Sequence, residues 1–329
     1  MPSRIVCPRH NSRKAIHFFN VRQIIFDSFC QPDFATMPCM SQNSQRPKRV
    51  VPSRVFRLLL LSCAAFYLVV CTIMAISQRS LIYHPSVFVT AQVDQMALSA
   101  RLERWTNFTG QFIGFKRLSP KQPADGAVLI AYGNGSTATG SSHYADDIQS
   151  IAAFDIFILE YPGYEDRPGP PSERNLFNAA DEALQMLPTN KPVYLVGESL
   201  GTGVASHLAG TYPERIAGVV LLSPFNCLGS VAQNHFPILP VWLLLADRFP
   251  SEDYLRNYRG PVGVVVDGDD PVVPEKFGLR LYNGYAGPKR LWEFPLGGHT
   301  DILEPPWKFW KEVVEFWQTN QSISPQQPT

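Results

Sequence analysis

Cysteine is scarce in the part of this chain that could fold into a domain. Of the six cysteines, only Cys227 lies beyond residue 77, and the others lie in the N-terminal stretch or inside one apolar run. One cysteine cannot close a disulfide within its own domain, and the cysteine spacings match no zinc-binding template. The body of the protein must therefore be held together by packing, and the spacings predict no metal site.

An excess of charge of either sign is also lacking. There are 29 basic and 28 acidic residues, which leaves a net charge of +1. Because nucleic-acid-binding proteins need a basic field, this balance speaks against a nucleic-acid partner. The sequence has no internal repeat and no low-complexity tract, while 45% of its residues are hydrophobic and 17% are charged. Such a composition is typical of a globular domain with a sizeable apolar core.

One segment carries no charge over about 20 residues, the length that crosses a bilayer core. It runs from Leu58 to Ser77 and reads LLLLSCAAFYLVVCTIMAIS. Basic residues are concentrated before it, at Arg46, Lys48, Arg49, Arg54 and Arg57, whereas only Arg79 closely follows it. The positive-inside rule therefore predicts a single-pass transmembrane signal anchor over residues 55–77 with a cytoplasmic N-terminus. The rest of the chain would lie on the periplasmic, extracytoplasmic or luminal side.

Two other interpretations of this segment stay open. A cleaved signal peptide could end near Ala75 or Ser77, although the apolar run is long for one. A buried core helix is the third, although core helices are seldom free of charge on every side. Residues 1–54 lack periodicity and are expected to be a disordered basic region in which Met37 or Met40 is the native start. Residues 320–329 are expected to be a short tail.

Strand-like and helix-like stretches alternate through residues 80–319. The expected strands are Gln111–Leu118, Ala127–Tyr132, Ile156–Glu160, Val193–Val196, Ala217–Leu222, Val262–Val266 and Leu291–Phe294. The expected helices are Ser142–Ala152, Glu173–Met186, Leu200–Ala209, Glu275–Tyr285 and Trp307–Gln318. This alternation predicts one α/β domain with a mostly parallel central sheet and helices on both faces. In such folds the active site lies at the carboxyl ends of the strands.

A serine motif follows one of these strands directly. Residues 197–201 read Gly-Glu-Ser-Leu-Gly, which is the G-x-S-x-G pattern of a strand–turn–helix elbow. The turn is so sharp that side chains two residues on either side of the serine would clash, hence the two glycines. Ser199 would stand at a helix N-terminus, where free N–H groups favour developing negative charge. We expect Ser199 to be a nucleophile, the alternative being a chance match.

A serine nucleophile needs a base and an acid that orients it. The chain order of this fold requires a histidine near the C-terminus, and His299, in a glycine-rich loop after the last expected strand, meets that requirement. Of the other histidines of the body, His143 and His207 are assigned to helices, His84 to the segment that leads into the domain and His235 to the insertion. For the acid, Asp267, Asp269 and Asp270 compete after the strand Val262–Val266, with Asp267 too close to the strand end.

Two backbone donors are needed for the oxyanion of a tetrahedral intermediate. We expect the N–H of Leu200, directly after the nucleophile, and the N–H of Asn134 in the glycine-rich loop Gly133-Asn134-Gly135. The alternative for this loop is a simple turn. Asn134-Gly135-Ser136 is also a glycosylation sequon, as are the tripeptides that begin at Asn107 and Asn320. A glycan on Asn134 would block the site, so we expect Asn134 to be unmodified.

Several motifs together carry a family likeness: YGNGS at 132–136, LEYPGYEDRPGPPSE at 159–173, GESLG at 197–201, DDPVVP at 269–274 and GGHTD at 297–301. From about residue 80 to 318 the chain resembles membrane-anchored α/β-hydrolases of the serine aminopeptidase and lysophospholipase-like group. In many hydrolases of this fold the acid stands four residues before the proline that ends a D-x-V-V-P-like motif. Here that proline is Pro274, which selects Asp270, with Asp269 second. The chain departs from the family at Tyr132, where histidine is common.

The resemblance implies hydrolysis of carboxylic esters, thioesters or, more rarely, peptides, without a metal or an organic cofactor. We therefore expect a serine esterase that acts on small-molecule or lipid acyl esters through Ser199, His299 and Asp270. A serine peptidase is the first alternative, in which Glu198 or Glu160 would capture an amino terminus. A non-catalytic, membrane-tethered binding protein is the second. An insertion at about residues 226–258 is expected to be either a packed cap or an apolar lid over an acyl-chain pocket.

Overall fold

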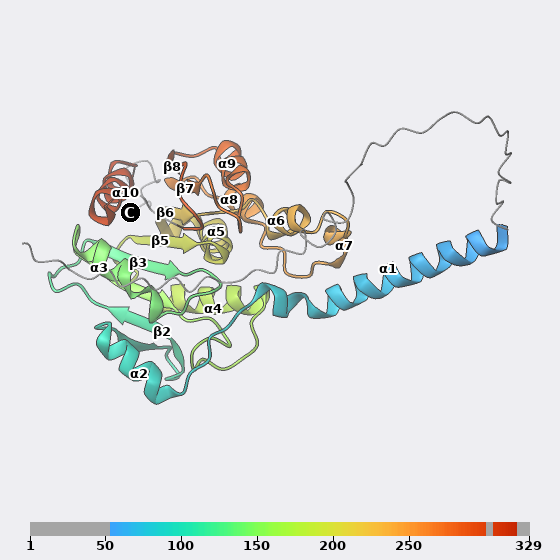
Figure 1. Cartoon of the computed structure of the whole chain (residues 1–329). Helices are drawn as coiled ribbons and strands as arrows, with labels where there is room; N and C mark the ends of the chain where they lie inside the picture. The colour runs from blue at the N-terminus through green and yellow to red at the C-terminus, as the bar shows by residue number, and fades with distance from the viewer. Residues whose placement is uncertain (1–52, 301–304, 321–329) are drawn as a thin grey trace, which may run out of the picture. The chain divides into compact units, whose positions relative to one another are not determined.

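The computed structural model describes residues 53–300 and 305–320. The expected N-terminal region with Met37 and Met40, Asp301 of the GGHTD motif and most of the expected tail lie outside these residues. Contacts group Arg57–Thr329 into one unit, which contains the whole hydrolase domain. The elements below are those of the described residues (Figure 1).

The strands are β1 (Glu103–Thr106), β2 (Phe112–Arg117), β3 (Gly126–Ala131), β4 (Phe154–Leu159), β5 (Val193–Glu198), β6 (Ile216–Leu222), β7 (Val262–Asp267) and β8 (Lys289–Phe294). The helices are α1 (Ser53–Ile82), α2 (Thr90–Ser99), α3 (His143–Gln149), α4 (Glu173–Met186), α5 (Leu200–Thr211), α6 (Leu228–His235), α7 (Val241–Leu244), α8 (Ser251–Leu255), α9 (Glu275–Gly284) and α10 (Pro306–Asn320). Two short 3-10 turns, η2 (Gly140–Ser142) and η3 (Pro213–Arg215), precede α3 and β6.

One sheet of eight strands contains all of these strands, in the order β1-β2-β4-β3-β5-β6-β7-β8. Every pairing from β4 to β8 is parallel, and β2 pairs antiparallel with both β1 and β4. The strands β3 and β4 are buried along their whole length, as expected of strands covered on both faces. The expected mostly parallel α/β fold is confirmed, and so are the seven expected strands.

The direction in which successive strands are added to the sheet reverses at β3. The chain steps from β3 to β4 in one direction and then from β4 past β3 to β5 in the other. Crossovers between parallel strands are right-handed as a rule, which predicts that α3 and α4 lie on opposite faces of the sheet. The helices α10 and α3 pack together, with Trp310 against Tyr144, while α5 follows α4 on the other face. The carboxyl ends of β3 and β5 therefore flank the point where strand order reverses, which is where α/β folds bind ligands.

Two elements have no counterpart in the expected pattern, the helix α2 and the edge strand β1. The helix buries only Val93 and Ala97, and the strand, which reads Glu-Arg-Trp-Thr, buries only Trp105. Neither segment carries enough apolar residues to produce a periodic signal. They take their structure from the hydrolase core, where Trp105 packs against Phe157 of β4.

The apolar run Leu58–Ser77 forms the middle two thirds of a single long helix. This helix, α1, extends past the expected anchor boundary at Ser77 and ends at Ile82. Within the described part of the chain it is the one helix long and apolar enough to cross a membrane, judged by length and composition. Most of its side chains are exposed and Cys71 is buried, so α1 is not a core helix of this domain.

Candidate active site

The turn between β5 and α5 holds Ser199 in a strained conformation. Its backbone angles are φ 48° and ψ −114°, a region that residues with side chains rarely adopt. A Cβ atom on Gly201 would lie 2.0 Å from the carbonyl oxygen of Ala131, and one on Gly197 would lie 2.8 Å from the carbonyl oxygen of Gly201. Both glycines are therefore required for the close approach of α5 to the ends of β3 and β5.

His299 and Asp270 complete a line of hydrogen bonds from Ser199. The Oγ atom of Ser199 lies 2.9 Å from Nε2 of His299, and Nδ1 of His299 lies 2.7 Å from Oδ2 of Asp270. A carboxylate can only accept, so Nδ1 carries the proton and Nε2 is left to accept from the serine hydroxyl. This arrangement can remove a proton from Ser199 and return it to a leaving group.

The side chain of Asp270 is buried and held by two backbone N–H groups. Its carboxylate has no solvent exposure, and its Oδ1 accepts from the backbone N–H groups of Val272 and Val273, each at 2.8 Å. Asp269, the second candidate from the sequence, is exposed to solvent. The structure therefore brings Asp270, and not Asp269, to the imidazole of His299.

Asp267 supports the loop that carries His299. It is buried and accepts from the hydroxyl of Ser223 at 2.8 Å, while the same hydroxyl accepts from the N–H of Thr300 at 3.2 Å. Ser223 follows β6 directly, with a positive φ of 48°. The sequence offered no signal for this contact, because the three residues lie at or beyond the ends of three different strands, which only the sheet brings together.

The loop after β3 lies directly against the nucleophile turn. A Cβ atom on Gly133 would stand 3.4 Å from Cβ of Ser199. Asn134 and Gly135 form a turn, closed by a hydrogen bond of 3.0 Å from the N–H of Ser136 to the carbonyl of Gly133. Leu200 is the first residue of α5, so its N–H is among those that a helix leaves without an intrahelical acceptor. Asn134 and Leu200 thus lie on the two segments that border Ser199.

Two residues that the sequence analysis did not single out hold the side chain of Asn134. Its Oδ1 accepts from the hydroxyl of Tyr164 at 2.7 Å and from the N–H of His84 at 3.0 Å. Its Nδ2 lies 2.8 Å from Nδ1 of His84. The nitrogen that would carry a glycan in the sequon is thus already in contact with an imidazole. His84 comes just after α1, which ties this loop to the segment that follows the apolar helix.

Tyr132, which replaces the histidine common in the resembled family, is fully buried beneath this loop. Its hydroxyl donates to Glu160, and its carbonyl accepts from the hydroxyl of Tyr161 at 2.8 Å. Burial, and next the neighbouring Glu165 carboxylate, raise the pKa of Glu160 well above its usual range. Tyr132 therefore acts as a buried support for the loop.

The two carboxylates considered for binding an amino terminus are both engaged inside the protein. Glu160 is fully buried and accepts from Tyr132 and from the N–H of Ala138. Glu198 accepts from the hydroxyl of Tyr144 at 2.7 Å and lies against Gly133. The remaining histidines are elsewhere: His207 lies 2.8 Å from Asp181, His143 is exposed on α3, and His235 of α6 lies 2.9 Å from the carbonyl of Val272.

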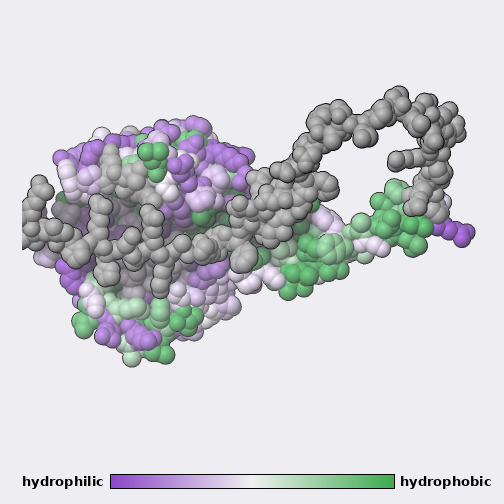
Figure 2. Space-filling view, in the orientation of Figure 1, coloured by the Kyte–Doolittle hydropathy of each residue, from purple (hydrophilic) through white to green (hydrophobic). Residues whose placement is uncertain are grey.

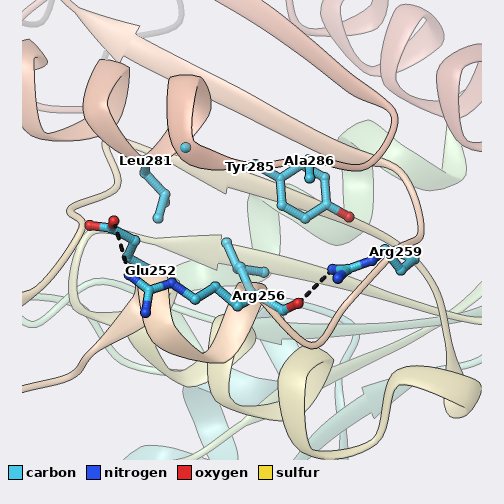
Figure 3. Close-up of a pocket in the computed structure, with 8 residues that line it drawn as sticks. Glu252, Arg256, Arg259, Leu281, Tyr285 and Ala286 are labelled. Carbon is cyan, nitrogen blue, oxygen red and sulfur yellow. Dashed lines mark hydrogen bonds and ion pairs between the residues drawn. The ribbon is translucent and has the colours of Figure 1, made fainter.

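Two cavities described in the domain lie away from Ser199. One, of about 150 Å³, lies between α8 and α9 and is shown in Figure 3. There Arg256 pairs with Glu252, and Arg259 donates to the carbonyl of Arg256 at 2.5 Å. The second, of about 320 Å³, is lined by Glu173, Asp181, His207 and Asp247 among others. In the described part of the chain no group of three or more His, Cys, Asp or Glu residues is placed to hold a metal ion.

The sheet order, the serine at the sharp turn after β5 and the crossover helices on both faces define an α/β-hydrolase fold. A family model described as "alpha/beta hydrolase fold" matches residues 126–253. An uncharacterized protein of Mycobacterium tuberculosis is 32% identical over 230 residues, covering 68% of this chain and 81% of the relative. The chain belongs to the α/β-hydrolase family.

Other relatives and solved structures agree with this assignment. Lysophosphatidylserine lipase ABHD12 of Danio rerio is 30% identical over 194 residues, which cover 52% of this chain and 50% of that protein. The chain thus spans about half the length of that lipase. Esterase Pf2001 of Pyrococcus furiosus matches with a TM-score of 0.54 at 16% identity, over 73% of this chain and 99% of the esterase. Est1E of Butyrivibrio proteoclasticus matches with a TM-score of 0.52 at 16% identity, over 65% and 97%. These structures show the fold.

Proposed function

We propose that this protein is a membrane-anchored serine esterase that hydrolyses acyl esters through Ser199, His299 and Asp270. The observation that carries the proposal is the unbroken hydrogen-bonded line from the strained Ser199 through His299 to a buried, doubly hydrogen-bonded Asp270. Strain at a functional residue persists only where the surrounding structure enforces it, and here two glycines and the end of β3 do so.

The steps follow from the atoms that meet at Ser199. Its Oγ attacks the acyl carbonyl while Nε2 of His299 takes the hydroxyl proton. The N–H groups of Leu200 and Asn134 hold the oxyanion, and Asp270 stabilises the imidazolium. The tetrahedral intermediate then expels the alcohol, which takes the proton from His299. A water molecule, deprotonated by the same imidazole, hydrolyses the acyl-enzyme and releases the acid.

We assign the substrate to the class of lipid acyl esters. Lysophosphatidylserine lipase ABHD12 is a relative at 30% identity, and an apolar helix that could cross a membrane directly precedes the catalytic domain. Thioesters are the second substrate class that the same mechanism would hydrolyse. A peptidase is less well supported, since Glu160 is buried and Glu198 is engaged by Tyr144. A non-catalytic binding protein would have no need for the complete Ser199–His299–Asp270 line.

The domain arrangement belongs to this proposal. Residues 55–77 serve as a signal anchor, residues 80–319 form the hydrolase domain, and the insertion at about 226–258 contains α6, α7 and α8. The basic residues 1–54 stay in the cytoplasm, because each positive charge resists transfer across the bilayer. The catalytic domain then works on the periplasmic, extracytoplasmic or luminal side, and residues 320–329 are a tail.

The decisive experiment combines covalent labelling with turnover. A fluorophosphonate probe should label the wild-type protein, and the wild type should hydrolyse at least one member of a panel of p-nitrophenyl esters, acyl thioesters and lysophospholipids. Ser199→Ala should abolish labelling and lower turnover by several orders of magnitude while leaving the thermal unfolding unchanged. Ser150→Ala, an exposed serine at the end of α3, is the matched control and should keep both properties. Labelling that persists in Ser199→Ala would refute the assignment.

A further inference from the structure

The insertion between β6 and β7 contains an uncharged apolar segment at residues 236–245. It reads Phe-Pro-Ile-Leu-Pro-Val-Trp-Leu-Leu-Leu and includes α7. Four of its large side chains face outward, with exposed fractions of 45% for Phe236, 81% for Ile238, 70% for Trp242 and 63% for Leu243, whereas Val241 and Leu245 are buried against the domain. A run of this kind on a water-exposed surface would be costly, because soluble domains rarely expose contiguous apolar patches.

This apolar segment is fastened along one face of α1. The hydroxyl of Tyr67 donates to the carbonyl of Ile238 at 2.8 Å. Near the C-terminal end of the helix, Gln78 donates to the carbonyl of Leu244 at 3.2 Å and accepts from the N–H of Ala246 at 2.7 Å. Figure 1 shows α7 beside the C-terminal half of α1.

The residues of α1 that lose exposure follow a helical stripe between these two contacts. Val70, Cys71, Met74, Ala75 and Gln78 are buried or half-buried, at the 3- and 4-residue spacing of one helix face. The residues from 58 to 66 are exposed on every side. The helix is thus covered on one face over its C-terminal half and bare over its N-terminal half, and Figure 2 shows the hydrophobic surface along it.

The contacts also set the depth of the segment relative to α1. Tyr67 and Gln78 are about 16 Å apart along the axis, at about 1.5 Å per residue. This is about half the ~30 Å hydrocarbon thickness of a bilayer, or one leaflet. Tyr67 lies near the middle of the apolar run and Gln78 at its end. If α1 spans a membrane, the segment fastened to it must therefore lie inside the leaflet nearest the catalytic domain.

Five backbone N–H groups of the segment are satisfied within the segment, as a lipid environment requires. The backbone N–H groups of Leu239, Val241, Leu243, Leu244 and Leu245 donate to carbonyls of the segment itself, and Pro237 and Pro240 have no N–H. The carbonyl of Ile238 and the hydroxyl of Tyr67 satisfy each other. Unsatisfied backbone groups are costly in hydrocarbon, because no water is present there to replace the missing hydrogen bonds.

At the membrane surface the segment gives way to charged partners. Asp247 accepts from Arg79 at 3.3 Å and from the hydroxyl of Tyr83 at 3.0 Å. At the N-terminal end of the segment, α6 contacts the loop that carries Asp270. There Nε2 of His235 lies 2.9 Å from the carbonyl of Val272, two residues after Asp270. The segment therefore connects the lipid to the neighbourhood of the catalytic groups.

We propose that residues 236–245 are a second membrane-embedded element, immersed in the leaflet nearest the catalytic domain, and that it brings lipid esters to Ser199. The membrane placement depends on α1 being the anchor, and the delivery role rests on the proposed function. The occupant of this apolar surface is the acyl-chain region of a bilayer.

Fluorescence quenching tests the immersion without any reference to catalysis. The full chain is reconstituted in phosphatidylcholine vesicles with brominated acyl chains, which quench tryptophans in the hydrocarbon region. The emission lost in Trp242→Phe isolates the signal of Trp242. The emission lost in Trp307→Phe isolates the signal of Trp307, which is also exposed and belongs to α10, at the opposite end of the domain from α7 in Figure 1. We expect Trp242 to be quenched and Trp307 to be unaffected. Equal quenching of the two, or none of Trp242, would overturn the proposal.

A kinetic comparison tests delivery. In Ile238→Ser/Leu243→Ser, hydrolysis of a short soluble ester should be unchanged, while hydrolysis of an ester embedded in vesicles should fall by about tenfold or more, since two apolar side chains leave the lipid. The control Leu98→Ser/Leu118→Ser changes two exposed leucines elsewhere in the domain and should alter neither rate. An unchanged rate on the embedded ester would overturn the delivery role. If the wild type hydrolyses neither ester, the proposed function fails, while quenching still decides the immersion.

Discussion

At the scale of single residues, the environment of Asp270 explains how one carboxylate among three neighbours can orient His299. Two backbone N–H groups, from Val272 and Val273, fix one oxygen and leave the other for the imidazole. Asp267 is committed to Ser223, and Asp269 faces solvent. A carboxylate in this position holds the imidazole in the tautomer that can accept from serine.

The first prediction follows from this contrast. Asp270→Asn should lower kcat by about 10⁴-fold, because an amide can donate to Nδ1 and favour the wrong tautomer of His299. Asp269→Asn removes an exposed carboxylate and should change kcat by less than about twofold. Steady-state kinetics on a soluble ester would measure both. A larger loss in Asp269→Asn than in Asp270→Asn would show that Asp269, and not Asp270, orients His299.

Glu160 provides a second prediction at this scale. Burial is the main reason that its pKa is raised well above the usual value of about 4.5, so in the folded protein Glu160 holds its proton to a higher pH than in the unfolded chain. Its contribution to stability is full below the unfolded pKa and is lost as the pH rises through the folded pKa. Glu160→Gln cannot titrate and should lose less stability than the wild type as the pH rises from 5 to 8.

Thermal unfolding of both proteins across this pH range, in one detergent, checks the expectation. The difference in melting temperature between wild type and Glu160→Gln should shift in favour of the variant as the pH rises. Glu103→Gln, a change at an exposed edge-strand glutamate, should give a curve parallel to that of the wild type. Parallel curves for Glu160→Gln would show that Glu160 does not titrate differently in the folded and unfolded chains.

At the scale of elements, the end of α1 and the loop after β3 are joined through His84. The helix ends at Ile82, and two residues later the backbone and ring of His84 both contact the side chain of Asn134. Tyr164, from the loop after β4, completes the clamp. Three segments far apart in sequence thus position the N–H that is proposed to hold the oxyanion.

The third prediction tests this clamp. His84→Ala keeps the backbone contact but removes the ring, so the Asn134 loop should be less well positioned. We expect kcat on a soluble ester to fall by about 3- to 10-fold with little change in KM, since an oxyanion donor acts mainly in the transition state. His84→Gln, which offers an acceptor to Nδ2 of Asn134, should recover part of the loss. The exposed histidine His143 is the control, and His143→Ala should leave kcat unchanged. A loss confined to KM would place His84 in substrate binding.

At the scale of the whole molecule, the unequal charge on the two sides of the apolar run predicts on which side of a membrane the hydrolase domain lies. Five basic residues precede the run and one closely follows it. The fourth prediction is that alkaline phosphatase fused to the C-terminus is active in a bacterial host, while a fluorescent reporter of the cytoplasm is dark there. The same reporters fused on the N-terminal side of the apolar run should give the opposite pattern, with the phosphatase inactive and the fluorescent reporter bright. Phosphatase that is inactive at the C-terminus would place the hydrolase domain in the cytoplasm.

Much of this architecture could be predicted from local sequence. Strand β3 is a continuous apolar run, and β4 contains one after Asp155. The Gly197–Gly201 motif predicts a sharp turn because it lacks side chains where backbones meet. His299 follows from chain order alone, and the length of the Leu58–Ser77 run predicts a membrane helix. Apart from the assignment of His299, each of these features depends on residues that are close together in the chain, so its physical cause can be recognised before the fold is known.

Other features were decided only by tertiary structure. The edge strand β1 and the helix α2 have too few apolar residues to be recognised, and they form because the core offers Trp105 a partner in Phe157. The contacts of His84 with Asn134, of Ser223 with Asp267 and of Tyr67 with Ile238 join residues separated by 50, 44 and 171 positions. Single hydrogen bonds leave no periodic or compositional pattern, so their partners are known only when the sheet and its crossovers have brought the loops together.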